Sequence, residues 1–252
     1  MSAFKYQERP EKSDLCAIVI PTHKKDYTES ERFCLHRAVN ILAKWDIFFV
    51  TDYDNTNQPI KLEDQQLRSS VFPKKIFESV RTYSNWLLTD QLYQRFGLYK
   101  KILICQTDVL IIEDQVERWA NKDYDYIGAP WHGLISIKPN YRSTVEFNNT
   151  EYKLFVGNGG FSMRDGNRIC AALRRNAEFI SEFTENEDGA FSFLGIIDPI
   201  FQLAPYHEAC LFSLELRAAE TMAKTEKMPM GFHGLEKYDP NLWALVLKLI
   251  GG

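Results

Sequence analysis

Two short apolar runs that flank a polar triplet constrain the fold of this chain more than any other stretch. Ile102-Leu103-Ile104-Cys105 leads into Gln106-Thr107-Asp108, and Val109-Leu110-Ile111-Ile112 follows at once. Such runs are typical of buried strands in a mostly parallel sheet, where helices cover both faces. An acid between buried strands is costly unless it is paired, hydrogen-bonded or bound to a metal. Because ligands of open α/β sheets bind at the carboxyl ends of strands, Asp108 is a candidate ligand residue. An acid in an ordinary turn is the alternative.

The segment before residue 53 predicts a strand, a helix and a second strand. Residues 15–20 form an apolar run that ends at Pro21-Thr22-His23, residues 30–44 show a helical pattern, and residues 46–50 lead into Thr51-Asp52. This order predicts parallel strands joined by a right-handed crossover. Asp52 therefore also lies at a strand end, where it could hold a base or a ribose hydroxyl, or be a solvated turn acid.

The rest of the chain predicts further helices and strands. Three helices and one strand are expected, the helices near residues 74–80, 84–96 and 167–183 and the strand at 126–131. Segments 54–67 and 132–153 are polar and predict loops, the second long enough to be a lid or an acceptor-binding segment. Gly157-Asn158-Gly159-Gly160 implies close backbone approach, positive φ or a tight hairpin. Residues 230–234 predict an apolar turn, and neither a dinucleotide fingerprint nor a P-loop occurs.

Composition bounds the class of protein. The chain has 252 residues, of which 45% are hydrophobic and 25% charged, as expected for a globular protein with a sizeable core. No repeat or linker divides it, so we expect one domain over residues 15–241, a polar segment at 1–14 and a short apolar segment at 242–252. The net charge of −4 does not suggest broad nucleic-acid binding.

Cysteine content and the terminal segments indicate a compartment. Five cysteines without a CxxC pair fit a reducing environment. Residues 1–14 lack the apolar core of a signal peptide, and the run 242–250 is too short to span a bilayer. The expected location is cytoplasmic, with association at the inner membrane face left open. The last segment is expected to be a packing helix, with an interfacial anchor or a link to a further domain as alternatives.

Six short blocks resemble, in their order, a family of GT-A class nucleotide-sugar glycosyltransferases that was long described only as a domain of unknown function. The blocks are Tyr83-Ser84-Asn85, Gln106-Thr107-Asp108, Asp125 through Trp131, Gly157 through Arg164, Asn186-Glu187-Asp188 and Gly231-Phe232-His233. The resemblance spans roughly residues 15–234, and the two long blocks are its specific part. It implies a GT-A, Rossmann-like α/β fold, a single domain with a central mostly parallel sheet flanked by helices. The layout is also similar to that of inverting galactosyltransferases.

The resemblance implies a divalent cation, Mn²⁺ or Mg²⁺, held by Asp108 and His233. Both ions accept oxygen ligands and substrate phosphates, and a histidine ligand favours Mn²⁺. The chain departs from the usual Asp-x-Asp pattern because Gln106 stands at the first acid, which puts the strength of metal binding in question. A packed, capping or phosphate-binding histidine is the alternative for His233. The implied donor-binding residues are Thr22, Asp52, Arg81, Asn85, Gln106, Thr107, Gly159 and Gly160.

The resemblance also implies roles in catalysis and acceptor binding. Asp188 would be the base that takes the acceptor proton, and Glu187 would orient the acceptor sugar. The alternative is an acid pair favoured by the positive end of a helix dipole. Trp131 and Tyr141 could stack on an acceptor sugar, although packing is the commoner use of such rings.

The function implied is transfer of a sugar from a nucleotide-sugar donor, expected to be UDP-linked, to a glycan or polysaccharide acceptor with inversion. One alternative is a sugar nucleotidyltransferase, although Pro21-Thr22-His23-Lys24-Lys25 lacks the glycines that its phosphate loop needs. Another is a non-catalytic carbohydrate-binding module or a degenerate relative of the enzymes. The sequence does not indicate an oligomeric state.

Overall fold

The computed structural model describes residues 6–24, 26–52, 68–137 and 151–251. The predicted loop at 54–67 and most of the predicted loop at 132–153, with Tyr141, lie outside these ranges.

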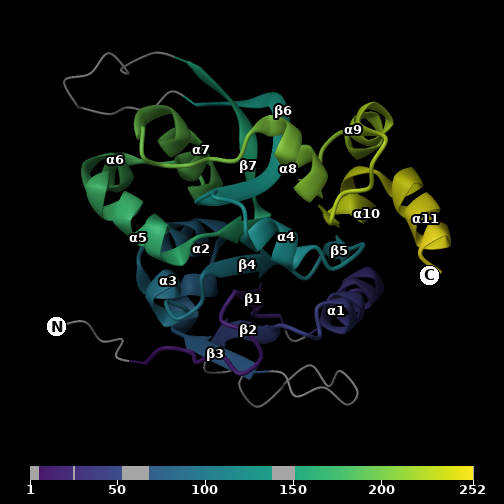
Figure 1. The fold of residues 1–252 in the computed structure, drawn as a ribbon, viewed down its shortest axis with the longest axis horizontal. Helices are drawn as coiled ribbons and strands as arrows, with labels where there is room; N and C mark the ends of the chain where they lie inside the picture. The colour runs from purple at the N-terminus through teal and green to yellow at the C-terminus, as the bar shows by residue number, and fades with distance from the viewer. Residues whose placement is uncertain (1–5, 25, 53–67, 138–150, 252) are drawn as a thin grey trace.

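A six-stranded sheet forms the centre of the fold. Its strands are β1 (Cys16–Pro21), β2 (Asp46–Asp52), β3 (Arg68–Phe72), β4 (Lys101–Cys105), β6 (Tyr126–Ile137) and β7 (Tyr152–Arg164). Across the sheet they follow the order β3-β2-β1-β4-β7-β6 (Figure 1). The first four are parallel, and β7 runs antiparallel to both β4 and β6. The predicted α/β fold with a mostly parallel central sheet is confirmed.

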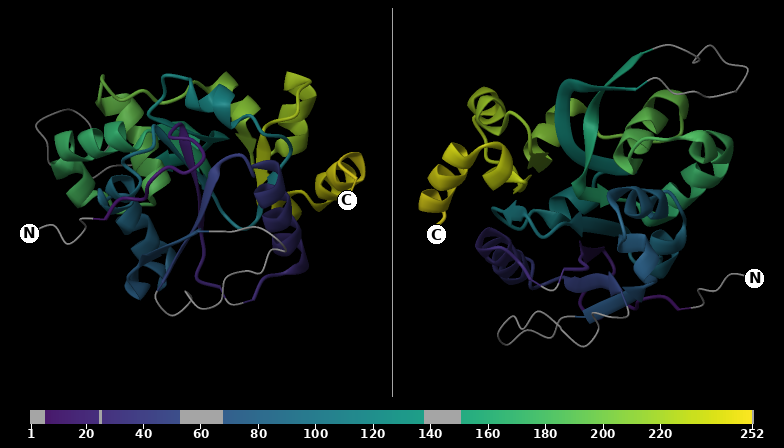
Figure 2. Two further views of the ribbon diagram at one scale, coloured as in Figure 1. Left: turned by 60° about the horizontal axis from the view of Figure 1, so that its bottom comes forward. Right: turned by 180° about the vertical axis from the view of Figure 1, so that it is seen from behind.

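Helices cover both faces of this sheet, which explains why its central strands β1 and β4 are mostly apolar and buried. One face packs against η2 (Lys74–Phe77), α2 (Val80–Leu87), α3 (Gln91–Arg95), α5 (Gly166–Arg175), α6 (Ala177–Glu182) and α7 (Glu187–Ile197). The other face packs against α1 (Glu29–Ile41), α4 (Val116–Ala120) and α8 (Tyr206–Phe212). Figure 1 shows α5, α6 and α7 gathered at one side of the molecule, and the same green segments lie together in both views of Figure 2.

A second, three-stranded sheet lies beside α1. It contains β5 (Val109–Ile111), β9 (Gly231–His233) and β8 (Ser213–Leu214), with β5 antiparallel and β8 parallel to β9. The chain leaves the large sheet at the polar triplet, where the Val109 N–H donates to the Gln106 carbonyl (3.1 Å). The expectation that residues 109–112 continue the parallel sheet is therefore wrong, because this turn redirects them into the small sheet. The predicted apolar turn at 230–234 is β9 instead.

Four further local expectations need correction. The helix predicted at 84–96 is two helices, α2 and α3, and the one predicted at 167–183 is likewise two, α5 and α6. Residues 74–77 form a 3₁₀ turn rather than an α-helix. The glycine block at 157–160 is not a hairpin, since β7 runs through it without a break. The spacing of apolar residues does not reveal such breaks, because two short helices in succession can keep the apolar spacing of one long helix. Helix ends are in any case uncertain by one or two residues.

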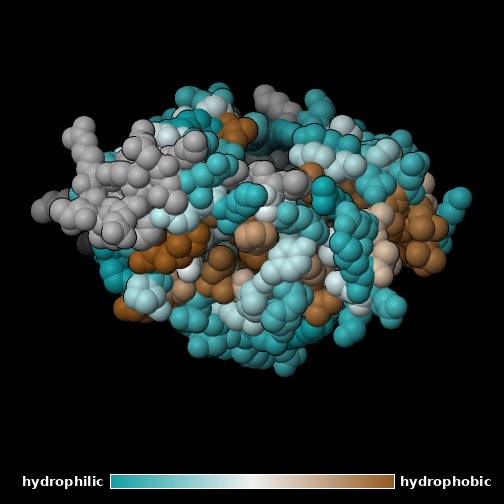
Figure 3. Space-filling model, turned by 90° about the horizontal axis from the view of Figure 1, so that it is seen from above, coloured by the Kyte–Doolittle hydropathy of each residue, from teal (hydrophilic) through white to brown (hydrophobic). Residues whose placement is uncertain are grey.

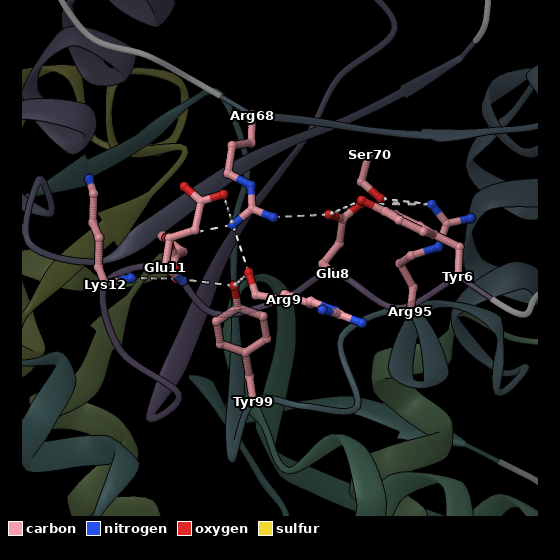
Figure 4. Close-up of polar contacts among 10 residues, drawn as sticks. Tyr6, Glu8, Arg9, Glu11, Lys12, Arg68, Ser70, Arg95 and Tyr99 are labelled. Atoms are coloured by element: carbon pink, nitrogen blue, oxygen red, sulfur yellow. Dashed lines mark hydrogen bonds and ion pairs between the residues drawn. The ribbon is translucent and has the colours of Figure 1, made fainter.

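The N-terminal segment packs against the amino ends of the parallel strands (Figure 4). Glu8 is 3% exposed, and its carboxylate lies 3.3 Å from the guanidinium of Arg68 and 3.9 Å from that of Arg95. The backbone N–H groups of Glu11 and Lys12 donate to the Asp46 carboxylate. Residues from Glu8 onward thus belong to the folded domain, and they bind at the edge opposite to the carboxyl ends of the strands.

The C-terminal part forms α9 (Ala218–Thr225), α10 (Leu235–Tyr238) and α11 (Pro240–Leu249). Leu242 and Val246 of α11 are buried in a small core with β5 and β9, as expected for a packing helix, whereas Leu245 and Leu249 are exposed. Figure 3 shows apolar surface on the side of the molecule where α11 lies. Among the described residues, no helix has the length and apolar character needed to cross a bilayer. All five cysteines are reduced and buried.

Candidate active site

A pocket of about 480 Å³ opens at the carboxyl ends of β1 and β4. Thr22 follows β1, and Gln106, Thr107 and Asp108 follow β4, so the topology brings four predicted site residues to its wall. The Thr107 hydroxyl donates to Glu31 (2.8 Å), which lies in the first turn of α1 and forms part of its capping box. The strand ends meet here because parallel strands place their carboxyl ends at one edge of the sheet.

The opposite wall of the pocket is aromatic. Phe77 stacks on His23 with ring centroids 5.8 Å apart and on Tyr83 at 6.4 Å. All three residues line the pocket. Burial and the nearby carboxylate of Glu187 both raise the pKa of the Tyr83 hydroxyl. The pocket and the acid pair therefore meet at Tyr83, and a flat, partly apolar ligand group would find a matching surface on the stacked rings.

Asp108 forms an acidic end of the pocket, and His233 lies directly behind it. The Nε2 atom of His233 lies 3.4 Å from Asp108 Oδ1 and 3.2 Å from Gln106 Oε1. Residues Val109 and His233 are paired across β5 and β9, which explains why distant parts of the chain meet. Burial opposes the effect, but contact with His233 holds the pKa of Asp108 below its ordinary value. The Asp108 side chain is 46% exposed and so remains accessible to a ligand.

The second nitrogen of His233 faces a buried acid. Nδ1 lies 3.1 Å from Glu215 Oε1, in an ion pair that lacks the alignment of a hydrogen bond. Burial alone would lower the pKa of His233, but the carboxylates of Asp108 and Glu215 outweigh it and raise the pKa to about 9. With Nδ1 facing Glu215, Nε2 is the nitrogen that faces Gln106 and Asp108, two residues of the pocket wall.

The donor set at this end fits a divalent cation with few protein ligands. Asp108 offers an exposed carboxylate and His233 an imidazole nitrogen, a pair that Mn²⁺ accepts when substrate phosphates and water complete the shell. Within the described residues, no cluster of three or more His, Cys, Asp or Glu side chains is arranged around a metal position.

Two consecutive glycines of β7 separate the Asp108–His233 end from the acid pair. A β-carbon on Gly160 would lie 2.2 Å from His233 Nε2, and one on Gly159 would lie 2.6 Å from Glu187 Oε1. Any side chain at these positions would displace the imidazole or the carboxylate. The glycines are therefore required by close packing of functional groups on both sides of one strand, and neither has the positive φ that a turn would need.

Glu187 is held on all sides at the start of α7. Its Oε1 accepts from the fully buried guanidinium of Arg164 (3.2 Å) and its Oε2 from the hydroxyl of Ser84 (2.6 Å). The same hydroxyl accepts the Glu187 N–H. The side chain is only 6% exposed. These contacts join α2, β7 and α7, and the predicted role of Glu187 in orienting an acceptor stays a prediction.

Asp188 follows directly and is less constrained. Its Oδ1 accepts the Gly189 N–H (2.8 Å). Burial and the negative charge of Glu187 raise the pKa of Asp188 to about 7. A carboxylate with such a pKa accepts a proton more readily than an ordinary aspartate near neutral pH. Neither Asp188 nor Glu187 lines the pocket itself, so a bound molecule would have to extend past Tyr83 to reach them.

Four predicted residues lie elsewhere than the sequence suggested. Trp131 is 5% exposed and packs against Gly157, so its ring face is covered and it does not offer a stacking surface to an acceptor. Arg81 is exposed and donates to the Thr184 carbonyl. Asn85 is exposed on α2, and Asp52 is buried at the end of β2. The last three do not line the pocket.

Sequence reasoning missed four polar residues that organise the site, namely Ser84, Asn158, Arg164 and Glu215. Three of them, Ser84, Asn158 and Arg164, stand inside the six sequence blocks named above, but roles were assigned only to the residues beside them. A buried arginine after a glycine-rich strand needs a carboxylate partner, and this could have pointed from Arg164 to Glu187. Glu215 has no such signal, because only the small sheet brings it to His233.

Comparisons with known proteins agree with this geometry at the level of the fold. The family model described as "Protein of unknown function (DUF5672)" matches residues 66–233, more than half of the chain. No curated protein sequence matches the chain. The solved galactosyltransferase LgtC, in complex with donor and acceptor sugar analogs, aligns with a TM-score of 0.51 at 13% identity, covering 86% of each chain. It shows that the fold is that of GT-A glycosyltransferases, as the sequence blocks predicted.

Two other solved structures align more weakly. The apo glycosyltransferase GlyE of Streptococcus pneumoniae TIGR4 has a TM-score of 0.47 at 11% identity, covering 86% of this chain and 53% of that chain. Core-mannan synthase A of Aspergillus fumigatus, in a Mn/GDP form, has a TM-score of 0.45 at 10% identity, covering 71% of this chain and 69% of that chain.

Proposed function

The chain belongs to the family of proteins of unknown function DUF5672, and from its fold and site we propose that it is a glycosyltransferase moving a sugar from a nucleotide-sugar donor to a glycan acceptor. The observation that carries the proposal is the pair of glycines in β7. Gly160 touches His233 of the cation site and Gly159 touches the acid pair, so leaving-group and proton chemistry meet at adjacent residues. Fold alone would not suffice, since one fold serves many activities.

The donor would bind along the pocket. The base and ribose would lie between Thr22 and the stacked rings of His23, Phe77 and Tyr83, and the diphosphate would lie beside Asp108. Asp108 and His233 would hold Mn²⁺ or Mg²⁺, which supplies charge stabilisation for the departing nucleoside diphosphate. Gln106 and Thr107 would contact the nucleotide. Gly159 and Gly160 would meet the donor sugar only through their backbone edges, because Glu187 and His233 fill the space next to their α-carbons.

Asp188 would accept the proton of the acceptor hydroxyl as that oxygen attacks the anomeric carbon. The acceptor oxygen would attack the anomeric carbon on the side opposite to the departing nucleoside diphosphate, so the configuration at that carbon would be inverted in the product. Arg164 and Ser84 would keep the Glu187 carboxylate and the first turn of α7 in place, which fixes where Asp188 stands. The expected donor is UDP-linked and the expected product a polysaccharide or glycan.

A ligand panel tests the proposal. Nucleoside diphosphates and their sugar conjugates are added with Mn²⁺ or with a chelator, and thermal unfolding is followed. At about 100 times its dissociation constant a ligand adds roughly 2.7 kcal/mol of stability, which is a shift of several degrees. One nucleotide family should stabilise the protein only with the ion, and its sugar conjugate should then be consumed with a suitable acceptor. No shift with any nucleotide would contradict the proposal and favour a carbohydrate-binding module.

Association with the inner membrane face, which the sequence left open, can be tested. Leu245 and Leu249, exposed on α11, are the apolar surface through which such an association would act. Sedimentation with lipid vesicles, compared between the wild type and a Leu245→Ser/Leu249→Ser variant, tests it.

A further inference from the structure

Glu215 occupies a position that the proposed reaction does not use. It is 6% exposed, follows β8, and divides its two carboxylate oxygens between two partners. Oε1 pairs with His233 Nδ1 (3.1 Å), and Oε2 accepts from the amide nitrogen of Asn158. A buried carboxylate is costly unless such partners compensate its desolvation, so both contacts are needed to keep it there.

Asn158 continues the chain of contacts to the glycine strand. Its Oδ1 accepts the Gly160 N–H (3.1 Å), and the Gly160 carbonyl accepts the Gln106 N–H (2.9 Å). The side chain of Gln106 in turn contacts His233 Nε2 (3.2 Å). Five residues therefore form a closed set of contacts, which we call the Glu215 network: Gln106, Asn158, Gly160, Glu215 and His233.

The Glu215 network joins the two sheets. Asn158 and Gly160 belong to β7 and Gln106 follows β4, all in the large sheet, whereas Glu215 follows β8 and His233 ends β9 in the small sheet. The imidazole is fixed at three points: Glu215 at Nδ1, Gln106 and Asp108 at Nε2, and the backbone of Gly160 against the ring. Rotation of the ring would break the first contact and clash with the third.

We propose that Glu215 and Asn158 are positioning residues that hold the imidazole with Nε2 toward Asp108 and thereby set the affinity of the site for a divalent cation. The inference rests on the proposed function in that it assumes a cation at Asp108 and His233. Carboxylates behind a histidine ligand fix its orientation and raise its basicity, and their loss typically costs about 10- to 100-fold in metal affinity.

The donors and acceptors between positions 158 and 215 allow a reciprocal exchange. In Glu215→Gln the single amide oxygen can face only one of the two nitrogens, His233 Nδ1 or the Asn158 amide, so the new amide nitrogen is turned toward the other. Asn158→Asp places two carboxylates opposite each other. In the double variant the new amide at position 215 donates to the new carboxylate at position 158, whose other oxygen still accepts the Gly160 N–H. The net charge is also restored.

Binding of Mn²⁺ alone, measured from the free-ion signal in electron paramagnetic resonance, tests the proposal. Each single variant should bind Mn²⁺ about 10- to 100-fold more weakly, and the double variant should recover part of that loss. Urea unfolding of each variant separates this from a change in folding stability. Glu220→Gln is the matched control, because this exposed acid on α9 pairs with Lys224 and does not contact His233.

The His233→Ala variant separates failure of the inference from failure of the proposed site. If His233→Ala weakens Mn²⁺ binding while the single variants at 158 and 215 do not, the cation site stands and the positioning role is overturned. If His233→Ala leaves Mn²⁺ binding unchanged, the cation site is overturned and the positioning role with it. The positioning role would also be overturned if the single variants lost Mn²⁺ affinity only in proportion to their loss of folding stability and the double variant recovered no affinity.

Discussion

At the scale of single residues, Asp188 combines burial with a charged neighbour. We expect Asp188→Asn to reduce kcat by about 10²- to 10⁴-fold, the usual contribution of a general base. The Kd of the donor should change little, because Asp188 does not line the nucleotide pocket. Single-turnover transfer and calorimetric donor titration measure the two effects. Near wild-type turnover in the variant would remove Asp188 from the role of base.

The raised pKa of Asp188 also links stability to pH. Its folded-state pKa is about 7, against an ordinary value of 3.8, so between these values the folded protein binds more protons than the unfolded chain. The free energy of unfolding therefore loses this contribution as pH rises from about 4 to about 7. Asp188→Asn should become more stable relative to the wild type across that window, as urea unfolding at pH 5 and pH 8 would measure. The exposed Glu226→Gln serves as the control variant.

The backbone of Gly160 lies directly against the imidazole of His233. In Gly160→Ala the new methyl group would lie 2.2 Å from His233 Nε2 and must push the imidazole aside. Mn²⁺-dependent nucleotide binding should weaken at least tenfold, because a ring moved by an ångström no longer meets the ion. Gly189→Ala is the matched control, since its methyl would meet nothing closer than 3.5 Å and lies in a helix. Equal binding by both variants would mean that the imidazole is not a ligand.

At the scale of elements, one hydroxyl links α2 to α7. Ser84→Ala removes the donor to Glu187 Oε2 and the acceptor of the Glu187 N–H together. Leaving buried polar groups unsatisfied costs about 1–3 kcal/mol of unfolding free energy. Ser181→Ala, which removes an exposed hydroxyl contact within α6, should stay within about 0.5 kcal/mol. Urea unfolding compares them, and similar values for both would show that the link carries no stability.

The sequence predicted the elements whose pattern is local. It did not predict the position of elements that pair with distant segments of the chain. The apolar runs of β1, β2 and β4 and the acids after them identified one sheet edge, and Asp108 lies there as expected. Val109 to Ile111 has the same apolar character, yet its pairing with β9 puts it in another sheet. Apolarity predicts burial but not the partner strand. For the same reason Glu215 could not be found, since its contact with His233 exists only once β8 and β9 pair.

At the scale of the whole molecule, the two edges of the large sheet have separate tasks. Glu8→Ala would remove a buried carboxylate that pairs with both Arg68 and Arg95, at a cost of about 1–3 kcal/mol in unfolding free energy. The KM for the donor should not change, because the pocket lies at the other end of the strands. Glu11→Ala removes an exposed partner of Arg68 and should cost less than about 1 kcal/mol. A raised KM in Glu8→Ala at full folding would contradict this separation.

The five interior thiols have a practical consequence. Cys16, Cys34, Cys105, Cys170 and Cys210 are all buried, and burial raises the pKa of each thiol. Thiolate is the reactive form, so the native protein should resist alkylating reagents. A single cysteine engineered onto the surface, for instance at Ser181 or Lys224, would then take up a fluorophore or spin label alone, without prior removal of the native cysteines.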